Sequence, residues 1–166
     1  MPETVSKLVA RAEMLSYMNT GTAETPAYEL IGEGFTSMAE SKNPKEYSRQ
    51  YVHERTERTD IIGYAPSIAY SADTYTNNPV IAKVRKVTDE ELIGTDAQVD
   101  IVSVNTFEGT AGAYVAYKRT YAIIPDAKGD GVEALIYSGN FKAVSDIVKG
   151  TWNDTTKTFT ADAEGE

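Results

Sequence analysis

His53 is the first residue to test for chemistry, because it is the only histidine in this 166-residue chain and cysteine is absent. A Ser-His-Asp triad or a histidine metal site would depend on this single imidazole, and no thiolate is available as a nucleophile or a ligand. A surface strand histidine explains the residue better. We therefore expect no catalytic residues, no bound metal and no cofactor.

Two adjacent carboxylates, Glu90 and Glu91, are the next candidates for acid–base chemistry. Neighbouring residues of a helix do not face each other, so this pair cannot flank one substrate atom as glycosidase carboxylates do. The stretch from Thr88 to Glu91 instead has the pattern of a capping box, which predicts a second helical turn closed by Gly94.

Glycine-rich segments could bind calcium or phosphate, but none has the required pattern. In Asp126–Gly131 (DAKGDG), Lys128 stands where a calcium ligand belongs, and Tyr137 replaces the closing glutamate. Gly32–Gly34 and Gly109–Gly112 lack the lysine and spacing of a phosphate-binding loop. We interpret all three segments as turns and predict that the chain is not an enzyme.

The overall charge argues against a nucleic-acid-binding protein. With 16 basic and 25 acidic residues the formal net charge is −9, whereas DNA binding depends on neutralising phosphates. The longest apolar run near the N-terminus, Leu8–Ala10, is far shorter than the core of a signal peptide, and no run approaches a membrane span. We expect synthesis in the cytoplasm and no membrane partner.

Alternation of apolar and polar residues predicts a mainly β chain. The expected strands are Ala12–Met18, Phe35–Ser41, Glu46–Glu54, Ser67–Asp73, Ala97–Phe107 and Ala113–Ile124, with Val132–Tyr137 returning after a turn. Pro125 is expected to end the long strand because it lacks a ladder donor. One helix is predicted over Pro79–Val87, with Asn78 as its N-cap. No repeat or linker divides the chain, so we expect one domain, 1–166.

Aromatic residues are numerous, with eleven tyrosines and one tryptophan. Tyrosine and tryptophan are enriched in interface cores, and tyrosine also has high strand propensity. Both explanations, an interface and ordinary β packing, stay open.

The chain's ending carries a resemblance to a known family. Tyr137–Thr160 (YSGNFKAVSDIVKGTWNDTTKTFT) contains a strand, a turn and the lone Trp152 ahead of Phe159. This ending comes after a fixed order of expected elements. They are the strand Phe35–Ser41, a polar segment that ends at Gly63-Tyr64, the strand Ser67–Asp73, the helix that begins at Asn78-Pro79, and two long strands. This order resembles the major tail tube proteins of long-tailed bacteriophages with non-contractile, siphovirus-type tails.

The resemblance implies an antiparallel β-sandwich or barrel-like subunit with extended arms. Such subunits assemble as hexameric rings that stack into a hollow tube, through which phage DNA passes into the host without specific binding. The implied partners are further copies of the chain, a tape-measure protein and the proteins at the tube ends. The implied location is the virion tail.

The resemblance also assigns roles to particular segments: an N-terminal arm at 1–11, a long loop at 41–62 and a flexible tail at 161–166. The expected inter-ring residues are Arg55, Glu57, Arg58 and Asp60, and the expected acidic lining of the lumen is Glu40, Glu46, Glu54 and Asp100. Trp152, Phe141 and Phe159 are expected as core or interface anchors, and Ser138–Asn140 as a strand end.

Three alternatives remain. The chain could be the tube protein of a contractile or phage-like injection particle. It could be a β-sandwich module that binds carbohydrate through exposed tyrosines and Trp152, which predicts a stable monomer. A small hydrolase would need two carboxylates converging in a pocket with shifted pKa values.

Overall fold

The computed structural model describes residues 6–163, except for the side chain of Asp130. Strands dominate this part of the chain, and α1 (Pro79–Asp89) is its single α-helix. The strand pairs whose register is defined are all antiparallel. The expected mainly β, antiparallel class with one short helix is therefore confirmed. No helix among residues 6–163 is long and apolar enough to span a membrane.

The chain forms two compact units, which we describe separately. The described part of unit 1 comprises 6–33, 99–120 and 145–163, and unit 2 comprises 34–98 and 121–144. Strand β8 (Ala113–Asp130) contributes its first part to unit 1 and its second part to unit 2. The single domain 1–166 stays a prediction.

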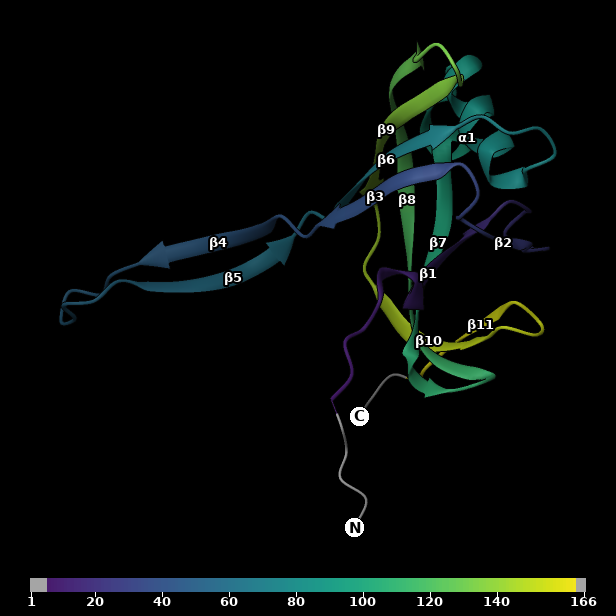
Figure 1. Cartoon of the computed structure of the whole chain (residues 1–166). Helices are drawn as coiled ribbons and strands as arrows, with labels where there is room; N and C mark the ends of the chain where they lie inside the picture. The colour runs from purple at the N-terminus through teal and green to yellow at the C-terminus, as the bar shows by residue number, and fades with distance from the viewer. Residues whose placement is uncertain (1–5, 164–166) are drawn as a thin grey trace. The chain divides into compact units, whose positions relative to one another are not determined.

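Unit 1 is a sheet in which β1 (Met14–Asn19) lies between β2 (Tyr28–Leu30) and β7 (Gln98–Thr110), followed by β8 (Figure 1). A short 3-10 helix, Arg11–Glu13, precedes β1. β10 (Val148–Asn153) pairs with the first part of β8 and with β11 (Thr158–Ala161). The C-terminal pair thus extends the sheet of unit 1.

Trp152 is the centre of the unit 1 core and is 0% exposed. Its ring stacks on Tyr17 and meets Tyr28 edge-on, with centroids 4.4 Å and 5.5 Å away. Val102, Val104 and Ala116 complete this buried cluster. Large aromatic side chains each bury about 150–250 Å², so this cluster supplies a major share of the hydrophobic stabilisation of unit 1.

Unit 2 joins four strands in the order β8, β9, β6 and β3. The bounds are Phe35–Ser41 for β3, Ser67–Asp73 for β6 and Ile136–Ala143 for β9. β4 (Pro44–Arg49) and β5 (Arg58–Tyr64) form a separate two-stranded sheet, and a 3-10 turn, Gly94–Ala97, precedes β7. The predicted strands at 35–41 and 67–73 are confirmed residue for residue.

The predicted helix is confirmed and runs two residues further than expected. The Asn78 side chain accepts hydrogen bonds from the backbone N–H groups of Val80 and Ile81, at 3.1 Å and 3.3 Å. This satisfies two donors that a helix start leaves open, and Pro79 lies at the first helical turn, where its missing donor costs nothing. Val84 and Val87 are buried one turn apart, as their spacing predicted.

The capping box predicted at Thr88–Glu91 is wrong. Thr88 belongs to the last turn of α1, and its hydroxyl donates to the Val84 carbonyl at 2.9 Å instead of opening a new turn. Glu90 is the C-cap, and its N–H donates to the Lys86 carbonyl. The buried position of Val87 keeps the helix continuous past Thr88, so the hydroxyl bonds backwards along it.

The prediction that Pro125 ends its strand is also wrong. β8 continues to Asp130, and Pro125 lies opposite Gly139 of β9. The register shifts between Pro125 and Ala127, so a bulge accommodates the proline's missing N–H within the sheet. The return strand begins at Ile136, and Val132 lies in the preceding turn.

Ser138–Asn140, expected at a strand end, lies in the middle of β9 between β6 and β8. Gly139 is required there by close packing. A Cβ added to it would collide with the Ile124 carbonyl oxygen and lie 2.9 Å from the Tyr70 hydroxyl. A glycine is therefore needed at position 139 because the neighbouring strand and Tyr70 lie too close for a side chain. From the sequence alone, such a glycine cannot be distinguished from one at a strand end.

Candidate assembly surface

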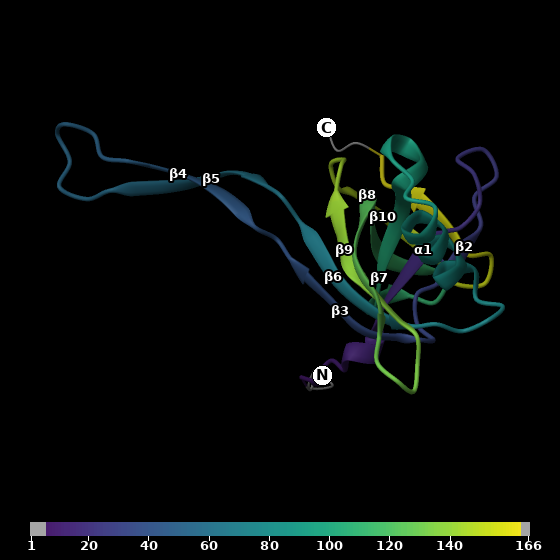
Figure 2. The same ribbon diagram turned by 90° about the horizontal axis from the view of Figure 1, so that it is seen from above.

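Residues 42–64, which we call the arm, are mostly exposed and belong to unit 2. Figures 1 and 2 show β4 and β5 extending away from the other strands of that unit. The predicted strand Glu46–Glu54 is corrected to Pro44–Arg49, because the chain turns where the Glu54 N–H donates to the Tyr51 carbonyl. The expected long loop 41–62 thus contains most of a β-hairpin.

The register divides the arm into two faces, because paired residues of antiparallel strands share a face. Tyr47 lies opposite Asp60, and Arg49 lies opposite Arg58. We call this side the network face. The other side carries Pro44 opposite Tyr64, Glu46 opposite Ile61 and Ser48 opposite Thr59, and a register shift leaves Ile62 as the extra, unpaired residue of a bulge. We call this side the apolar face.

Side chains of the network face contact one another. The Arg49 guanidinium lies 5.1 Å from the Tyr47 ring centroid and 5.7 Å from that of Tyr51, and it forms an ion pair with Asp60. Hydrogen bonds to the Tyr51 hydroxyl and to Asp60 raise the pKa of Arg49. Cation–π and ionic contacts of this kind stabilise the arm, since a lone two-stranded hairpin is only marginally stable in water.

The apolar face is exposed. Ile61, Ile62 and Tyr64 are 56%, 67% and 57% exposed. None of the three was among the expected site residues, although Ile61 and Ile62 lie within the expected long loop 41–62 and two adjacent isoleucines after a charged stretch were a usable signal. Ile61 and Tyr64 on this face and Ile62 in the bulge leave large apolar side chains exposed on a projecting element, and exposed apolar surface of this kind is typical of a site that binds another protein.

The expected inter-ring residues do lie on the arm and are all exposed: Arg55, Glu57, Arg58 and Asp60. Two of them already have ionic partners within it. Arg58 donates from Nε to Glu54 Oε2 at 2.9 Å, and Asp60 pairs with Arg49. Their role at ring contacts stays a prediction.

The four expected lumen carboxylates belong to different elements of the two units. Glu40 in β3, Glu46 in β4 and Glu54 in the arm's turn belong to unit 2, whereas Asp100 in β7 belongs to unit 1. Glu40 accepts a 2.7 Å hydrogen bond from Lys42, so its charge is locally compensated. The lumen assignment stays a prediction for all four.

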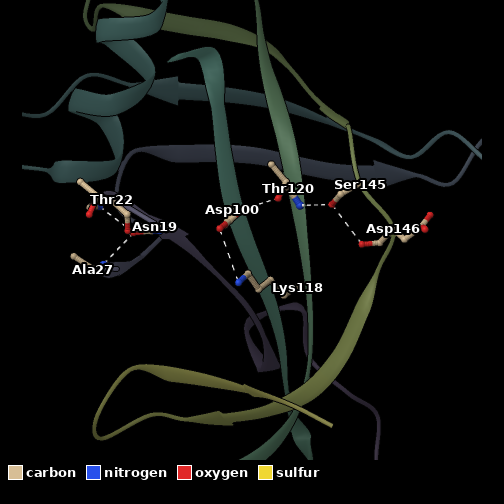
Figure 3. Close-up of polar contacts among 9 residues, drawn as sticks. Asn19, Thr22, Ala27, Asp100, Lys118, Thr120, Ser145 and Asp146 are labelled. Atoms are coloured by element: carbon tan, nitrogen blue, oxygen red, sulfur yellow. Dashed lines mark hydrogen bonds and ion pairs between the residues drawn. The ribbon is translucent and has the colours of Figure 1, made fainter. Parts of the chain in front are cut away.

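Asp100 has a structural environment within unit 1, shown in Figure 3. Its Oδ1 accepts a 2.5 Å hydrogen bond from the Thr120 hydroxyl, and Lys118 Nζ lies 3.9 Å from Oδ2. The Thr120 N–H in turn donates to Ser145 Oγ at 3.0 Å (Figure 3). Asp100 therefore links β7 to β8 as well as carrying charge.

The three aromatic anchors belong to two different units. Trp152 and Phe159 are cross-strand partners in unit 1, with Trp152 buried and Phe159 half-buried. Phe141 is buried in unit 2 and stacks on Tyr70 with centroids 4.5 Å apart. A buried Trp152 cannot serve as a carbohydrate platform, so that alternative loses the residue on which it depended.

Sites for chemistry are not evident in the described chain. Residues 6–163 contain no group of three or more histidine, aspartate or glutamate residues placed to hold a metal ion. An open hollow of about 350 Å³ lies in unit 2 and is lined by Asn43, Ala65, Pro66, Ser67, Lys142 and Ala143. It has no carboxylate pair, so it lacks the groups that the hydrolase alternative requires.

Comparisons with known proteins identify structures with a similar fold. No family model matches the chain, and no curated protein matches it. Among solved structures, it is similar to a chain from the tail of an empty GTA particle, computed with helical refinement and C6 symmetry. The TM-score is 0.58 at 10% identity, over 93% of this chain and 100% of that one.

A second similar structure is a chain from the 6-fold symmetrised baseplate of the anti-feeding prophage (AFP). Its TM-score is 0.51 at 9% identity, over 87% of this chain and 97% of that one. At such low identity these likenesses show the fold alone. The chain therefore has a fold found in tail and baseplate structures of phage-like particles, and this likeness does not single out the non-contractile type.

Proposed function

We propose that the chain is a structural tail protein whose copies form six-membered rings, which stack into a hollow tube. The observation that carries the proposal is the fold likeness to a chain of the GTA tail, which covers 100% of that chain. The structure of that tail was computed with C6 symmetry. Matching end to end at 10% identity indicates that the shape of the subunit has been kept while its sequence changed.

The exposed arm supports an assembling role. Apolar residues on a projecting two-stranded ribbon are an aggregation hazard in a monomer, and an ordered partner surface removes that hazard. A ring needs a heterologous contact, in which different surfaces of successive copies meet. The arm supplies one such surface, and the proposed single domain with its N-terminal arm and C-terminal tail supplies the others.

In the proposed tube, DNA passes through the lumen without binding to the subunits. With a net charge of −9 the subunit would repel phosphates, which favours passage of DNA without binding. The proposed partners are the neighbouring copies, a tape-measure protein and the tube-end proteins of a virion tail. No catalytic step is part of this function.

A second candidate is the tube of a phage-like injection particle, which the likeness to the AFP baseplate favours. The same ring-forming subunit would build that tube, and the tube would carry a cargo other than phage DNA.

The experiment is purification of the chain, sizing with light scattering, and electron microscopy of concentrated samples. We expect rings or tubes whose class averages have six-fold symmetry. A chain that stays monomeric at all concentrations, alone and with its encoded neighbours, would refute the proposal. Nuclease-protected DNA inside isolated particles would separate the virion tail from the injection particle.

A further inference from the structure

Two cations of unit 1 share one face of its sheet. Lys149 of β10 lies opposite Tyr117 of β8, so both side chains lie on the same face, and Arg119, two residues further along β8, lies there as well. Arg119 and Lys149 are therefore diagonal neighbours, at a spacing of about 7–8 Å. Trp152, three residues after Lys149, lies on the opposite face with its aromatic cluster.

Arg119 lacks an acceptor within the described chain. Its Nε is closed off from solvent and has no hydrogen-bond partner among residues 6–163. None of the ion pairs in that range involves Arg119 or Lys149, whereas the neighbouring Lys118 pairs with Asp100. A guanidinium that is partly removed from water is costly without a hydrogen-bonded anion. This face therefore needs a carboxylate from elsewhere.

The segment after β11 reaches the same face. Ala161 pairs with Gly150, and the Asp162 N–H donates to the Lys149 carbonyl at 3.0 Å, so the pairing continues one residue past β11. Asp162 therefore lies on the face of Lys149. Acidic residues then recur at every second position of the sequence, as Asp162, Glu164 and Glu166. Residues 164–166 lie outside the described residues, and a continued strand would put all three carboxylates on the face of the two cations.

The register also brings the charges to matching levels. Tyr117, Lys149 and Asp162 lie side by side across β8, β10 and β11. β8 and β11 are both antiparallel to β10, so they run in the same direction, and two residues further on Arg119 and Glu164 would share a level. Their strands are then about 9–10 Å apart, twice the spacing of neighbouring strands. Two long side chains extended towards each other can close this distance.

We propose that Arg119 and Lys149 form a carboxylate-binding site, and that residues 162–166 of the same copy occupy it as a strap that continues β11. The guanidinium of Arg119 suits this ligand because its planar fork binds a carboxylate through two parallel hydrogen bonds. The same copy is favoured because only a few residues join the strap to the site, which makes its effective concentration high. The strap also lengthens the pairing along β10 and leaves less of that sheet edge open to unspecific contacts. This inference concerns a single subunit and does not depend on the proposed assembly function.

Zero-length cross-linking tests the site on the full chain at low concentration. A carbodiimide, which joins a lysine amine to a carboxylate, should link Lys149 to Glu164 or Glu166. Mass spectrometry of a mixture of isotopically light and heavy chains should find these links within one copy. Arg119→Lys places a second amine in the site and should give links to the same glutamates. Lys118 is the matched control, because it neighbours Arg119 on the opposite face and should give none.

Light–heavy products would overturn the choice of the same copy. Links from Lys118 as frequent as those from Lys149, or no links to positions 164 and 166, would overturn the site itself.

A double-mutant cycle measures the contact without cross-linking. Arg119→Gln, and Glu164→Gln together with Glu166→Gln, should each raise the equilibrium constant of unfolding in urea by about three- to tenfold. All three changes combined should do no more than Arg119→Gln alone, because they remove the same contact. Glu24→Gln, at an exposed acidic residue of unit 1, should leave that constant unchanged. Additive effects of the Arg119 and glutamate variants would overturn the proposal, and the cross-links of the wild type decide it if Arg119→Gln does not fold.

Discussion

Trp152 of β10 stacks on Tyr17 of β1, with ring centroids 4.4 Å apart and planes inclined by 29°. The two residues are far apart in sequence, and β7 and β8 lie between their strands in the sheet order of unit 1. The indole ring thus bridges the sheet and fastens the C-terminal strand pair to the N-terminal one. Its removal tests how much unit 1 depends on this contact.

Trp152→Ala should lower the free energy of unfolding by about 3–5 kcal/mol, because it leaves a large cavity where the ring meets Tyr17 and Tyr28. Urea denaturation followed by circular dichroism measures the change. Phe159→Ala, at a half-buried neighbour, should cost clearly less. A loss below about 1 kcal/mol for Trp152→Ala would show that unit 1 does not rely on this cluster.

Tyr70 should make the protein sensitive to alkali. Burial raises the pKa of Tyr70 from the usual tyrosine value near 10 to about 12, because the residue is 3% exposed. The unfolded chain releases this proton first, so the associated stability is complete below pH 10 and is lost as pH rises towards 12. This change in the pKa of Tyr70 corresponds to roughly 2.7 kcal/mol of unfolding free energy.

Tyr70→Phe should therefore flatten the fall of unfolding free energy between pH 10 and 12. Denaturant titrations at a series of pH values compare the variant with the wild type. Burial also raises the pKa values of Tyr17 and Tyr28, which both proteins share, so a smaller decline should persist in the variant. Parallel curves for the two proteins would contradict the assignment.

Gly139→Ala should destabilise unit 2 by about 1–3 kcal/mol through overpacking. The new methyl group would meet the Ile124 carbonyl and the Tyr70 hydroxyl, and the β9 backbone would have to move. Gly63→Ala is the control, since its nearest atom, Lys45 Cδ, would lie 3.9 Å away. Thermal melts of both variants make the comparison, and similar melting temperatures would argue against the close approach.

Reversing Arg55 and Arg58 to Glu should hinder assembly while the subunit stays folded. The formal charge of residues 42–64 would change from +1 to −3, and the remaining residues of the chain carry −10, so repulsion between neighbouring copies would increase. The defect should be largest at low ionic strength, because salt screens exposed charges. Negative-stain microscopy across a salt series provides the measurement, and unchanged tubes at low salt would reject a role for the arm's charge.

Local patterns were sufficient for much of the fold. Alternation located the strands at 35–41 and 67–73, and Asn78 with Pro79 marked the helix start, because caps and pleats depend on residues within a few positions. The predictions failed where pairing with a strand distant in sequence determines the local structure. Pro125 remains in the sheet through a bulge opposite Gly139, and Gly139 lies within a strand because Ile124 and Tyr70 crowd it.

The sequence by itself determined the absence of cysteine chemistry, the acidic balance, the β character and the helix cap, since each depends on composition or on neighbouring residues. Only the tertiary structure decided that Trp152 is buried, that Asp100 bonds to Thr120, and that Ile61 and Tyr64 share an exposed face. Burial and register depend on which strands pair across the chain, and a one-residue shift in pairing moves a side chain to the other face.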